Sequence, residues 1–233
     1  MKRLVYLNFA ALLLIILLVT ACSKSNSPII IKEPNTLNFL ALGDSYTIGE
    51  GIESEESWPN QLTNKLIENE YNFNSPKIIA KTGWTTNQLL KAIEEEENVE
   101  KYNLVSLSIG VNNQFQSKPF EDFKSEFGEL LQTALELSDN SNNVFIVSIP
   151  DYGVTPFGEN NSETIAEDLD MYNAYMLSVC FMFDIPFIDI TEISRQLGDD
   201  SNALAEDQLH PSAYQYSLWV DEILPFALSL LVE

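Results

Sequence analysis

Apolar segments of strand length alternate along the chain with longer amphipathic segments. The predicted strands lie at 37–42, 77–80, 104–109, 144–149 and 187–190, and a segment of helix length separates each from the next. This alternation is typical of repeated strand–helix units, which form a parallel sheet between helices. We therefore predict an α/β fold of three layers, α/β/α, with a central parallel sheet of about five strands.

Helical periodicity is clearest in the middle of the chain. Five apolar residues fall on one stripe of a helix there, which is the pattern of a helix facing a core. They are Phe123, Phe127, Leu130, Leu131 and Ala134. Ser57 and Thr86 are start signals for two earlier helices. Two later helices are predicted at 169–183 and 212–231, and we expect Pro225 to bend or break the last one.

The N-terminal segment has a different pattern. Lys2 and Arg3 precede a strictly apolar run at 10–19, which is too short to span a bilayer comfortably and fits a signal peptide. The run leads into Val-Thr-Ala-Cys, ending at Cys22, which resembles a bacterial lipobox. This resemblance implies cleavage before Cys22 and lipidation of that cysteine. An ordinary signal peptide with an incidental cysteine is the alternative.

These patterns divide the chain into three parts. We predict a lipoprotein signal peptide at 1–21, a polar tether at 22–36 and one domain at 37–233, a length sufficient for a good core. Ile29 to Ile31, the apolar part of the tether, could pack as an edge strand. Ser23 after the cysteine favours the outer membrane over the inner one, by analogy with enteric bacteria.

Charge and cysteine content narrow the possible partners. The net charge is −23, and loss of Lys2 and Arg3 with the signal peptide would make it two charges more negative. Such a chain is a poor ligand for nucleic acid, and an anionic membrane would repel it, so the lipid would have to hold it there. The acidic run at 94–97 is expected to be a solvated helix end. Cys180 would have no disulfide partner and is expected to be buried.

Polar residues follow the first three predicted strands. Ser45 ends Gly-Asp-Ser after the first strand, Gly83 follows the second, and Asn112 lies in Gly-Val-Asn-Asn after the third. The carboxyl ends of parallel strands share one edge of the sheet, so these residues should converge. Taken singly, Gly83 could be an ordinary turn glycine and Asn112 a residue that caps a loop.

His210 is the only histidine of the chain, and Asp207 precedes it by three positions. A serine hydroxyl needs a base to become a nucleophile, and an imidazole base needs an acceptor that fixes its tautomer. His210 and Asp207 could fill these two roles. The alternative for this pair is a turn with satisfied hydrogen bonds.

In this order, Gly-Asp-Ser, a lone glycine, Gly-x-Asn and Asp-x-x-His resemble the four blocks of the SGNH (GDSL) esterase/lipase family, from residue 37 to about 225. The resemblance implies Ser45 as nucleophile, His210 as base and Asp207, rather than the rival Asp44, as the triad acid. It also implies an oxyanion hole made by the backbone N–H groups of Ser45 and Gly83 and the side-chain amide of Asn112.

The chain departs from the family at two positions. Tyr46 stands where the family often has Leu, and we expect it to touch no chemistry. Asn113 stands where the family usually has Asp, and its loss of charge could loosen the loop that aims Asn112. From the sequence alone, Asn113→Asp is therefore expected to be neutral or mildly beneficial.

The predicted function is that of a serine hydrolase that cleaves carboxylic esters through an acyl-enzyme, as a monomer held at the membrane through Cys22. Its substrates could be lysophospholipids, short acyl esters or acetylated glycans. The alternatives are a non-catalytic lipoprotein that binds glycan or lipid, and a thioesterase or peptidase with the same triad. No metal-ligand or nucleotide-binding motif is present, so no cofactor is expected.

The loops 114–119 and 150–161 follow the third and fourth predicted strands. They carry Phe115, Tyr152 and Phe157, which could shape an acyl pocket. The same rings could instead be packing beneath the loops.

Overall fold

The computed structural model describes residues 36–96, 100–140, 142–198 and 200–232. The predicted signal peptide, Cys22 and the segment from Ile29 to Ile31 lie outside these residues. Asn35–Glu233 form one compact unit.

A five-stranded parallel sheet forms the centre of this unit, in the order β2-β1-β3-β4-β5. The strands are β1 (Phe39–Asp44), β2 (Lys77–Lys81), β3 (Leu104–Ser108), β4 (Val144–Val147) and β5 (Phe187–Ile188). Every residue of β1, β3 and β4 is buried, which explains their nearly continuous apolar sequences. The predicted three-layer α/β fold is confirmed. β5 is shorter than predicted, since only two of its residues pair with β4.

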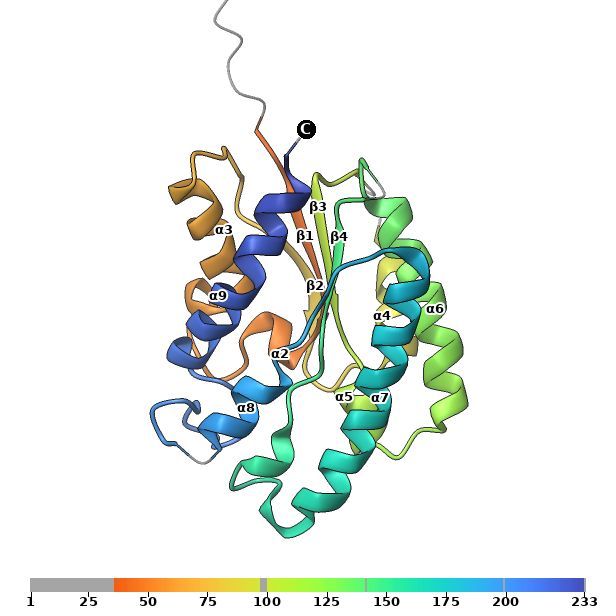
Figure 1. The fold of residues 1–233 in the computed structure, drawn as a ribbon, viewed down its shortest axis with the longest axis vertical. Coiled ribbons are helices and arrows are strands. Elements are labelled where there is room, and N and C mark those ends of the chain that lie inside the picture. Colours follow the sequence, from red (N-terminus) through yellow and green to blue (C-terminus); the bar gives the residue numbers. More distant parts are fainter. Residues whose placement is uncertain (1–35, 97–99, 141, 199, 233) are drawn as a thin grey trace, which may run out of the picture. The chain divides into compact units, whose positions relative to one another are not determined.

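Helices cover both faces of the sheet (Figure 1). The α-helices are α2 (Ser45–Ile48), α3 (Trp58–Glu68), α4 (Thr86–Glu94), α5 (Val111–Phe115), α6 (Phe120–Leu137), α7 (Ser162–Phe183), α8 (Thr191–Leu197) and α9 (Ala213–Leu230). Short 3-10 helices are η1 (Ser54–Glu56), η2 (Tyr152–Val154) and η3 (Glu159–Asn161). Helices α3 and α9 lie on one face, and α4, α6 and α7 lie on the other (Figure 1).

The predicted apolar stripe lies on α6, and all five of its residues are buried. Two other helices begin earlier than predicted: α4 is capped by Thr85, which forms a capping box with Gln88, and α7 begins at Ser162. The predicted break at Pro225 is wrong, because α9 runs through it. Pro225 is exposed, so water can satisfy the backbone carbonyl that the proline leaves unpaired.

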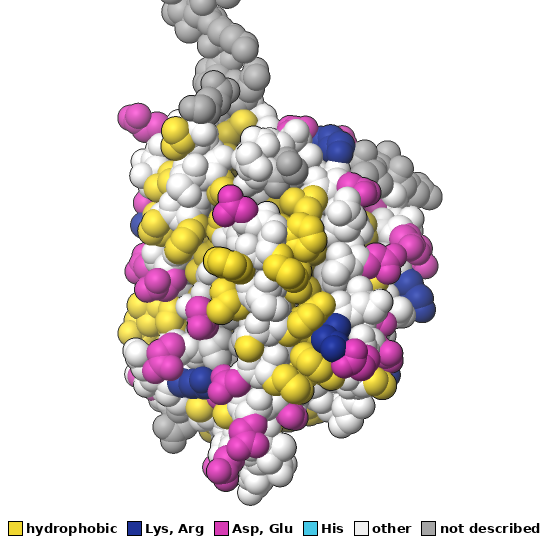
Figure 2. All heavy atoms as spheres, turned by 45° about the vertical axis from the view of Figure 1, so that its right-hand side comes forward, with side chains coloured by type: hydrophobic (Ala, Val, Ile, Leu, Met, Phe, Trp, Pro, Cys, Tyr) yellow, Lys and Arg dark blue, Asp and Glu magenta, His cyan; other side chains and the backbone are white. Residues whose placement is uncertain are grey.

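Helix α7 carries both buried and exposed apolar side chains. Cys180 is fully buried in α7, as predicted, whereas large apolar side chains of the same helix are exposed. These are Met171, Leu177, Phe181, Met182 and Phe183. Figure 2 shows hydrophobic side chains gathered over α7 among scattered acidic ones. Within the described ranges, no helix has both the length and the apolar character needed to cross a bilayer.

Candidate active site

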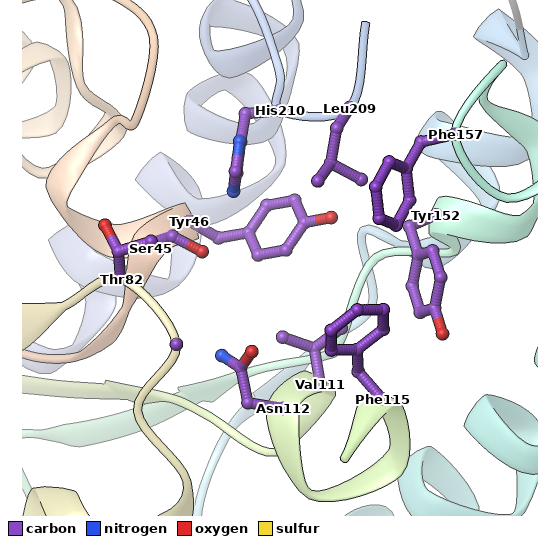
Figure 3. A pocket seen from close by; sticks show the side chains of 11 residues that line it. Ser45, Tyr46, Thr82, Val111, Asn112, Phe115, Tyr152, Phe157, Leu209 and His210 are labelled. Carbon is purple, nitrogen blue, oxygen red and sulfur yellow. The ribbon is translucent and has the colours of Figure 1, made fainter. Parts of the chain in front are cut away.

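The site lies at the carboxyl edge of the sheet, where β2, β1 and β3 end side by side. Ser45 begins α2 directly after β1, Gly83 follows β2, and Asn112 lies in α5 after β3. The connections from β1 and from β3 run to opposite sides of the sheet here, which is where open α/β sheets form binding crevices. The structure thus brings three residues distant in sequence to one cavity of about 200 Å³, where His210 joins them (Figure 3).

Asp207 contacts Nδ1 of the His210 ring and fixes its orientation. Oδ2 of Asp207 lies 2.6 Å from Nδ1 of His210, and its Oδ1 accepts hydrogen bonds from the backbone N–H groups of Leu209 (3.0 Å) and His210 (2.9 Å). Partial burial raises the pKa of Asp207, but these hydrogen bonds outweigh it and leave the pKa below its usual value. Asp207 therefore carries a negative charge that orients the imidazole, whose ring points toward Ser45 (Figure 3).

Asp44, the rival acid, has a different role. Its side chain accepts a hydrogen bond from the backbone N–H of Tyr46 (3.1 Å) and so caps α2. Burial raises the pKa of Asp44 to about 7, although the Tyr46 N–H and the nearby Asn112 amide favour the charged form. Its contacts are with the turn that presents Ser45, so it positions the serine instead of orienting the base.

Gly83 has a backbone conformation that requires glycine, with φ of +81°. A Cβ built there would meet no atom within 4 Å. Nε2 of Gln116 donates a hydrogen bond to the Gly83 carbonyl (2.8 Å), which ties this turn to the segment after α5. The backbone at Gly83 is therefore fixed and open to the cavity.

Asn112 is placed by the glycine two positions before it. Gly110 has φ of +127°, and a Cβ there would lie 2.8 Å from both Ile149 and Phe123. Asn112 is only 8 % exposed, and its Nδ2 makes no hydrogen bond of normal geometry to any residue that the structure describes, although it lies close enough to Asp44 to favour the charged form of that carboxyl group. An unpaired buried amide is costly, so this donor is available to a ligand oxygen.

Asn113 faces away from this cavity and fastens α4 to α5. Its Oδ1 accepts from the backbone N–H of Thr86 (3.0 Å), and its Nδ2 donates to the Thr86 hydroxyl (2.7 Å). That hydroxyl in turn donates to Glu126. The side-chain amide of Asn113 thus supplies both a donor and an acceptor, which a carboxylate could not do.

Two contributors were missed by the sequence analysis. The Tyr46 ring lies 5.1 Å from the His210 ring and stacks on Trp219 at 6.3 Å, so it packs against the base instead of standing apart from the chemistry. Gln116 fixes Gly83, as described above. An aromatic residue next to the candidate nucleophile was a visible signal for Tyr46, whereas nothing in the local sequence marks Gln116.

Three aromatic rings form the end of the cavity opposite Ser45 and Thr82 (Figure 3). Phe115, Tyr152 and Phe157 contact one another, with ring centroids 5.9–6.4 Å apart. Val111 and Leu209 add aliphatic contacts. The rings predicted to shape a pocket therefore do line one, and the cavity is apolar away from its polar end.

Residues 41–218 match the model of the GDSL-like Lipase/Acylhydrolase family. No curated protein matches the sequence. Among solved structures, TesA has a TM-score of 0.67 at 16% identity, over 83% of this chain and 99% of its own. A lipase from a goat rumen metagenome has a TM-score of 0.65 at 20% sequence identity, and the match covers 80% of this chain and 95% of the lipase.

A variant of an acetyl xylan esterase from Geobacillus stearothermophilus has a TM-score of 0.63 at 18% identity, over 81% of this chain and 93% of its own. At such identities these structures establish a shared fold. The match to the family model covers most of the chain and includes Ser45, Gly83, Asn112 and His210. The chain therefore belongs to the GDSL-like lipase/acylhydrolase family.

Proposed function

We propose that this protein is a serine hydrolase that cleaves carboxylic esters through an acyl-enzyme. The hydroxyl of Ser45 attacks the ester carbonyl while Nε2 of His210 takes its proton. The tetrahedral intermediate then expels the alcohol, which receives that proton from His210. Water, deprotonated by His210, attacks the acyl group on Ser45, and the acid leaves as Ser45 regains a proton.

The oxyanion of each tetrahedral intermediate would be held by the backbone N–H groups of Ser45 and Gly83 and by Nδ2 of Asn112. Donors that are fixed before the reaction stabilise developing charge without reorganisation. The observation that carries the proposal is the joint position of Ser45, His210 and Asn112 at one cavity. Asp207 contacts Nδ1 of His210, and Nδ2 of Asn112 has no hydrogen bond of normal geometry to the residues that the structure describes.

The cavity favours a short acyl group. Its volume of about 200 Å³ is below the roughly 300–1,000 Å³ of pockets that enclose drug-sized ligands, and its far end is aromatic. Among the predicted substrates, short acyl esters and acetylated glycans fit this space better than long-chain lipids. An acetyl xylan esterase among the structures with this fold is in keeping with that preference.

A panel of nitrophenyl esters of rising acyl length, with thioesters and acetylated sugars alongside, tests the proposal. We expect hydrolysis of short esters, and loss of nearly all activity in Ser45→Ala and in His210→Ala. Their double variant should be no worse than either, because triad members act as a unit. Ser178→Ala, which removes an exposed hydroxyl on α7, is the control.

Three results would speak against this function. Folded wild-type protein without hydrolase activity would favour a binding protein. Preference for thioesters would favour a thioesterase. Activity that survives in Ser45→Ala would remove the nucleophile assignment.

We also propose that the protein is anchored in a bacterial cell envelope, with the outer membrane favoured, through lipid on Cys22. The support is the lipobox-like sequence ending at Cys22 and the apolar run before it. The strong negative charge makes attraction to anionic lipid an unsuitable alternative means of attachment.

A further inference from the structure

A second cavity adjoins the catalytic one and shares two of its walls. It has a volume of about 530 Å³, and Phe115 and Tyr152 line both cavities. Ile165, Met171 and Tyr172 give the second cavity apolar surface, together with polar groups. The Phe115 and Tyr152 rings meet edge to face at 6.1 Å and 79°. These two rings therefore form a partition between the space beside Ser45 and a larger space beyond it.

The Tyr152 ring is fixed at its outer end. Its hydroxyl donates a hydrogen bond to Oε1 of Gln114 (2.7 Å), and Nε2 of Gln114 donates to Asp168 on α7 (3.0 Å). Only 6 % of Tyr152 is exposed. A buried ring whose polar end is satisfied in this way has little freedom to swing aside.

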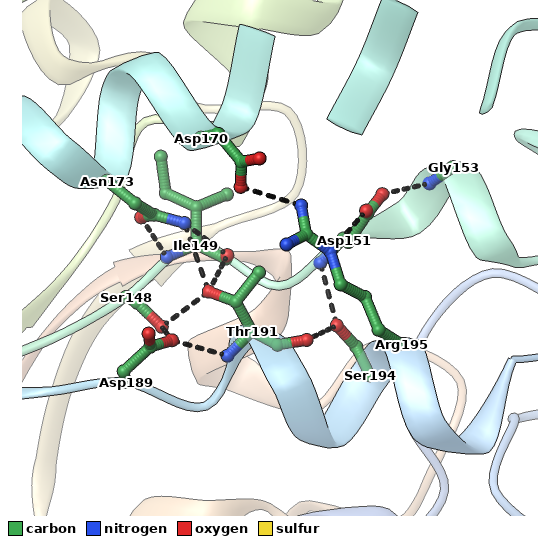
Figure 4. Close-up of polar contacts among 10 residues, drawn as sticks. All are labelled: Ser148, Ile149, Asp151, Gly153, Asp170, Asn173, Asp189, Thr191, Ser194 and Arg195. Atoms are coloured by element: carbon green, nitrogen blue, oxygen red, sulfur yellow. Dashed lines mark hydrogen bonds and ion pairs between the residues drawn. The ribbon is translucent and has the colours of Figure 1, made fainter. Parts of the chain in front are cut away.

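The backbone that carries Tyr152 is fixed as well (Figure 4). Asp151 accepts from the N–H of Gly153 (2.8 Å), and its own N–H donates to Ser194 (2.8 Å). Nε of Arg195 donates to the other carboxylate oxygen of Asp151 (2.9 Å). Asp151 and its partners thus hold η2 on both sides of Tyr152.

We propose that Tyr152 determines acyl-chain specificity by closing the catalytic cavity against the second one. This inference rests on the proposed ester hydrolysis and adds which residue limits the substrate. With the ring in place, the acyl group must end at the partition. Without it, the two cavities join, and a chain of medium length can extend past Phe115 into the second cavity.

The expected gain follows from burial of methylene groups. A single methylene in an apolar enzyme pocket changes specificity by about 10-fold or more. An octanoyl ester has several methylene groups that the closed cavity cannot hold. Opening the partition should therefore raise the ratio of kcat/KM for octanoyl over acetyl ester by at least about tenfold.

The test compares this ratio in the full-length wild-type protein and four full-length variants. Tyr152→Ala opens the partition directly. Phe115→Ala opens it with less risk to folding, because Phe115 is 54% exposed. In Tyr152→Ala/Met171→Trp, the larger indole is meant to occupy the second cavity, so that an acyl chain cannot enter it. Tyr214→Ala removes an exposed tyrosine that lines neither cavity, and it is the matched control.

We expect the ratio to rise in the first two variants, to return toward the wild-type value in the double variant and to stay unchanged in the control. A general loss of stability would lower both rates and leave the ratio constant. Unchanged ratios in folded Tyr152→Ala and Phe115→Ala would overturn the inference, as would a gain that persists in the double variant. Either result leaves ester hydrolysis itself intact, whereas an inactive wild type would refute the proposed function.

Discussion

Among single residues, Asn112 best distinguishes a catalytic role from a structural one, because its buried amide nitrogen has no hydrogen bond of normal geometry within the described part of the chain. If Nδ2 meets the developing oxyanion, Asn112→Ala should lower kcat by about 10²–10³-fold. KM should change little, since the contact strengthens mainly in the transition state. Steady-state kinetics with a short nitrophenyl ester, and thermal melts to check folding, measure this. A folded variant with near wild-type kcat would show that Asn112 is not a donor.

Substitution of the neighbouring Asn113 should lower the stability of the fold, whereas substitution of Asn112 should lower the catalytic rate. Asn113→Asp removes the hydrogen bond to the Thr86 hydroxyl and brings a second carboxylate to a hydroxyl that already binds Glu126. The structure therefore replaces the neutral effect expected from the sequence with a loss of roughly 1–3 kcal/mol in the free energy of unfolding. Urea denaturation of both proteins would measure it, and equal midpoints would contradict this account.

Asp44 should make stability depend on pH. Its pKa of about 7 in the folded protein lies above the ordinary value of 3.8. Between these values the folded state keeps a proton that the unfolded state has lost, so the free energy of unfolding falls as pH rises from about 4 to 7. Asp44→Asn keeps the cap and removes this titration. Denaturation at several pH values should show that the free energy of unfolding of the variant, relative to wild type, rises by a few kcal/mol between pH 4 and pH 7, about the range set by the two pKa values. The same pH dependence in both proteins would contradict this prediction.

The sequence predicted which residues meet at the site better than it predicted how they are supported. Order along the chain and the parallel-sheet rule suffice to place Ser45, Gly83 and Asn112 together. The hydrogen bonds of Asn113 with Thr86, and of Gln116 with Gly83, join residues about 30 positions apart. No local pattern specifies such long-range polar contacts.

At the scale of elements, Arg195 links α8 to the segment before η2 and to α7. It contacts Asp151, which is 2 % exposed, and Asp170. Removing one partner of a buried ion pair leaves an uncompensated charge. We therefore expect Arg195→Ala to lower the free energy of unfolding by about 3 kcal/mol.

The control for this prediction is Lys65→Ala in α3. Lys65 pairs with Glu68, but both side chains are largely exposed, so little stability should depend on them. Chemical denaturation of the two variants compares them directly. An equal loss in the free energy of unfolding in Lys65→Ala and Arg195→Ala would contradict the view that the burial of Asp151 makes its ion pair important for stability.

Element boundaries show where sequence patterns stop being informative. The buried strands β1, β3 and β4 are clear because both of their faces are covered. β5 is predicted too long, because Ile190 lies in the core beyond the last residue that pairs with β4, and its burial makes the apolar pattern longer than the strand. The start of α7 was missed because its first turns are polar, and tertiary contacts override the propensity of Pro225 to end α9.

For the molecule as a whole, attachment and catalysis should be separable. The cavity lies at the carboxyl edge of the sheet, whereas the described chain enters β1 at the opposite edge (Figure 1). Cys22→Ser should therefore release the protein from the membrane fraction without changing kcat for a soluble ester. Labelling with a fatty acid analogue, followed by fractionation, tests this. Wild-type protein that stays unlabelled and free would contradict the anchor.

Covalent capture of the nucleophile tests the central claim most directly. A fluorophosphonate should add to Ser45 in the wild-type protein, and mass spectrometry of the intact protein and its peptides should locate the adduct there. His210→Ala should react far more slowly, because the hydroxyl would lack its base, and Ser45→Ala should not react. Absence of an adduct in folded wild type, or an adduct on another residue, would contradict the assignment of this cavity as a serine hydrolase site.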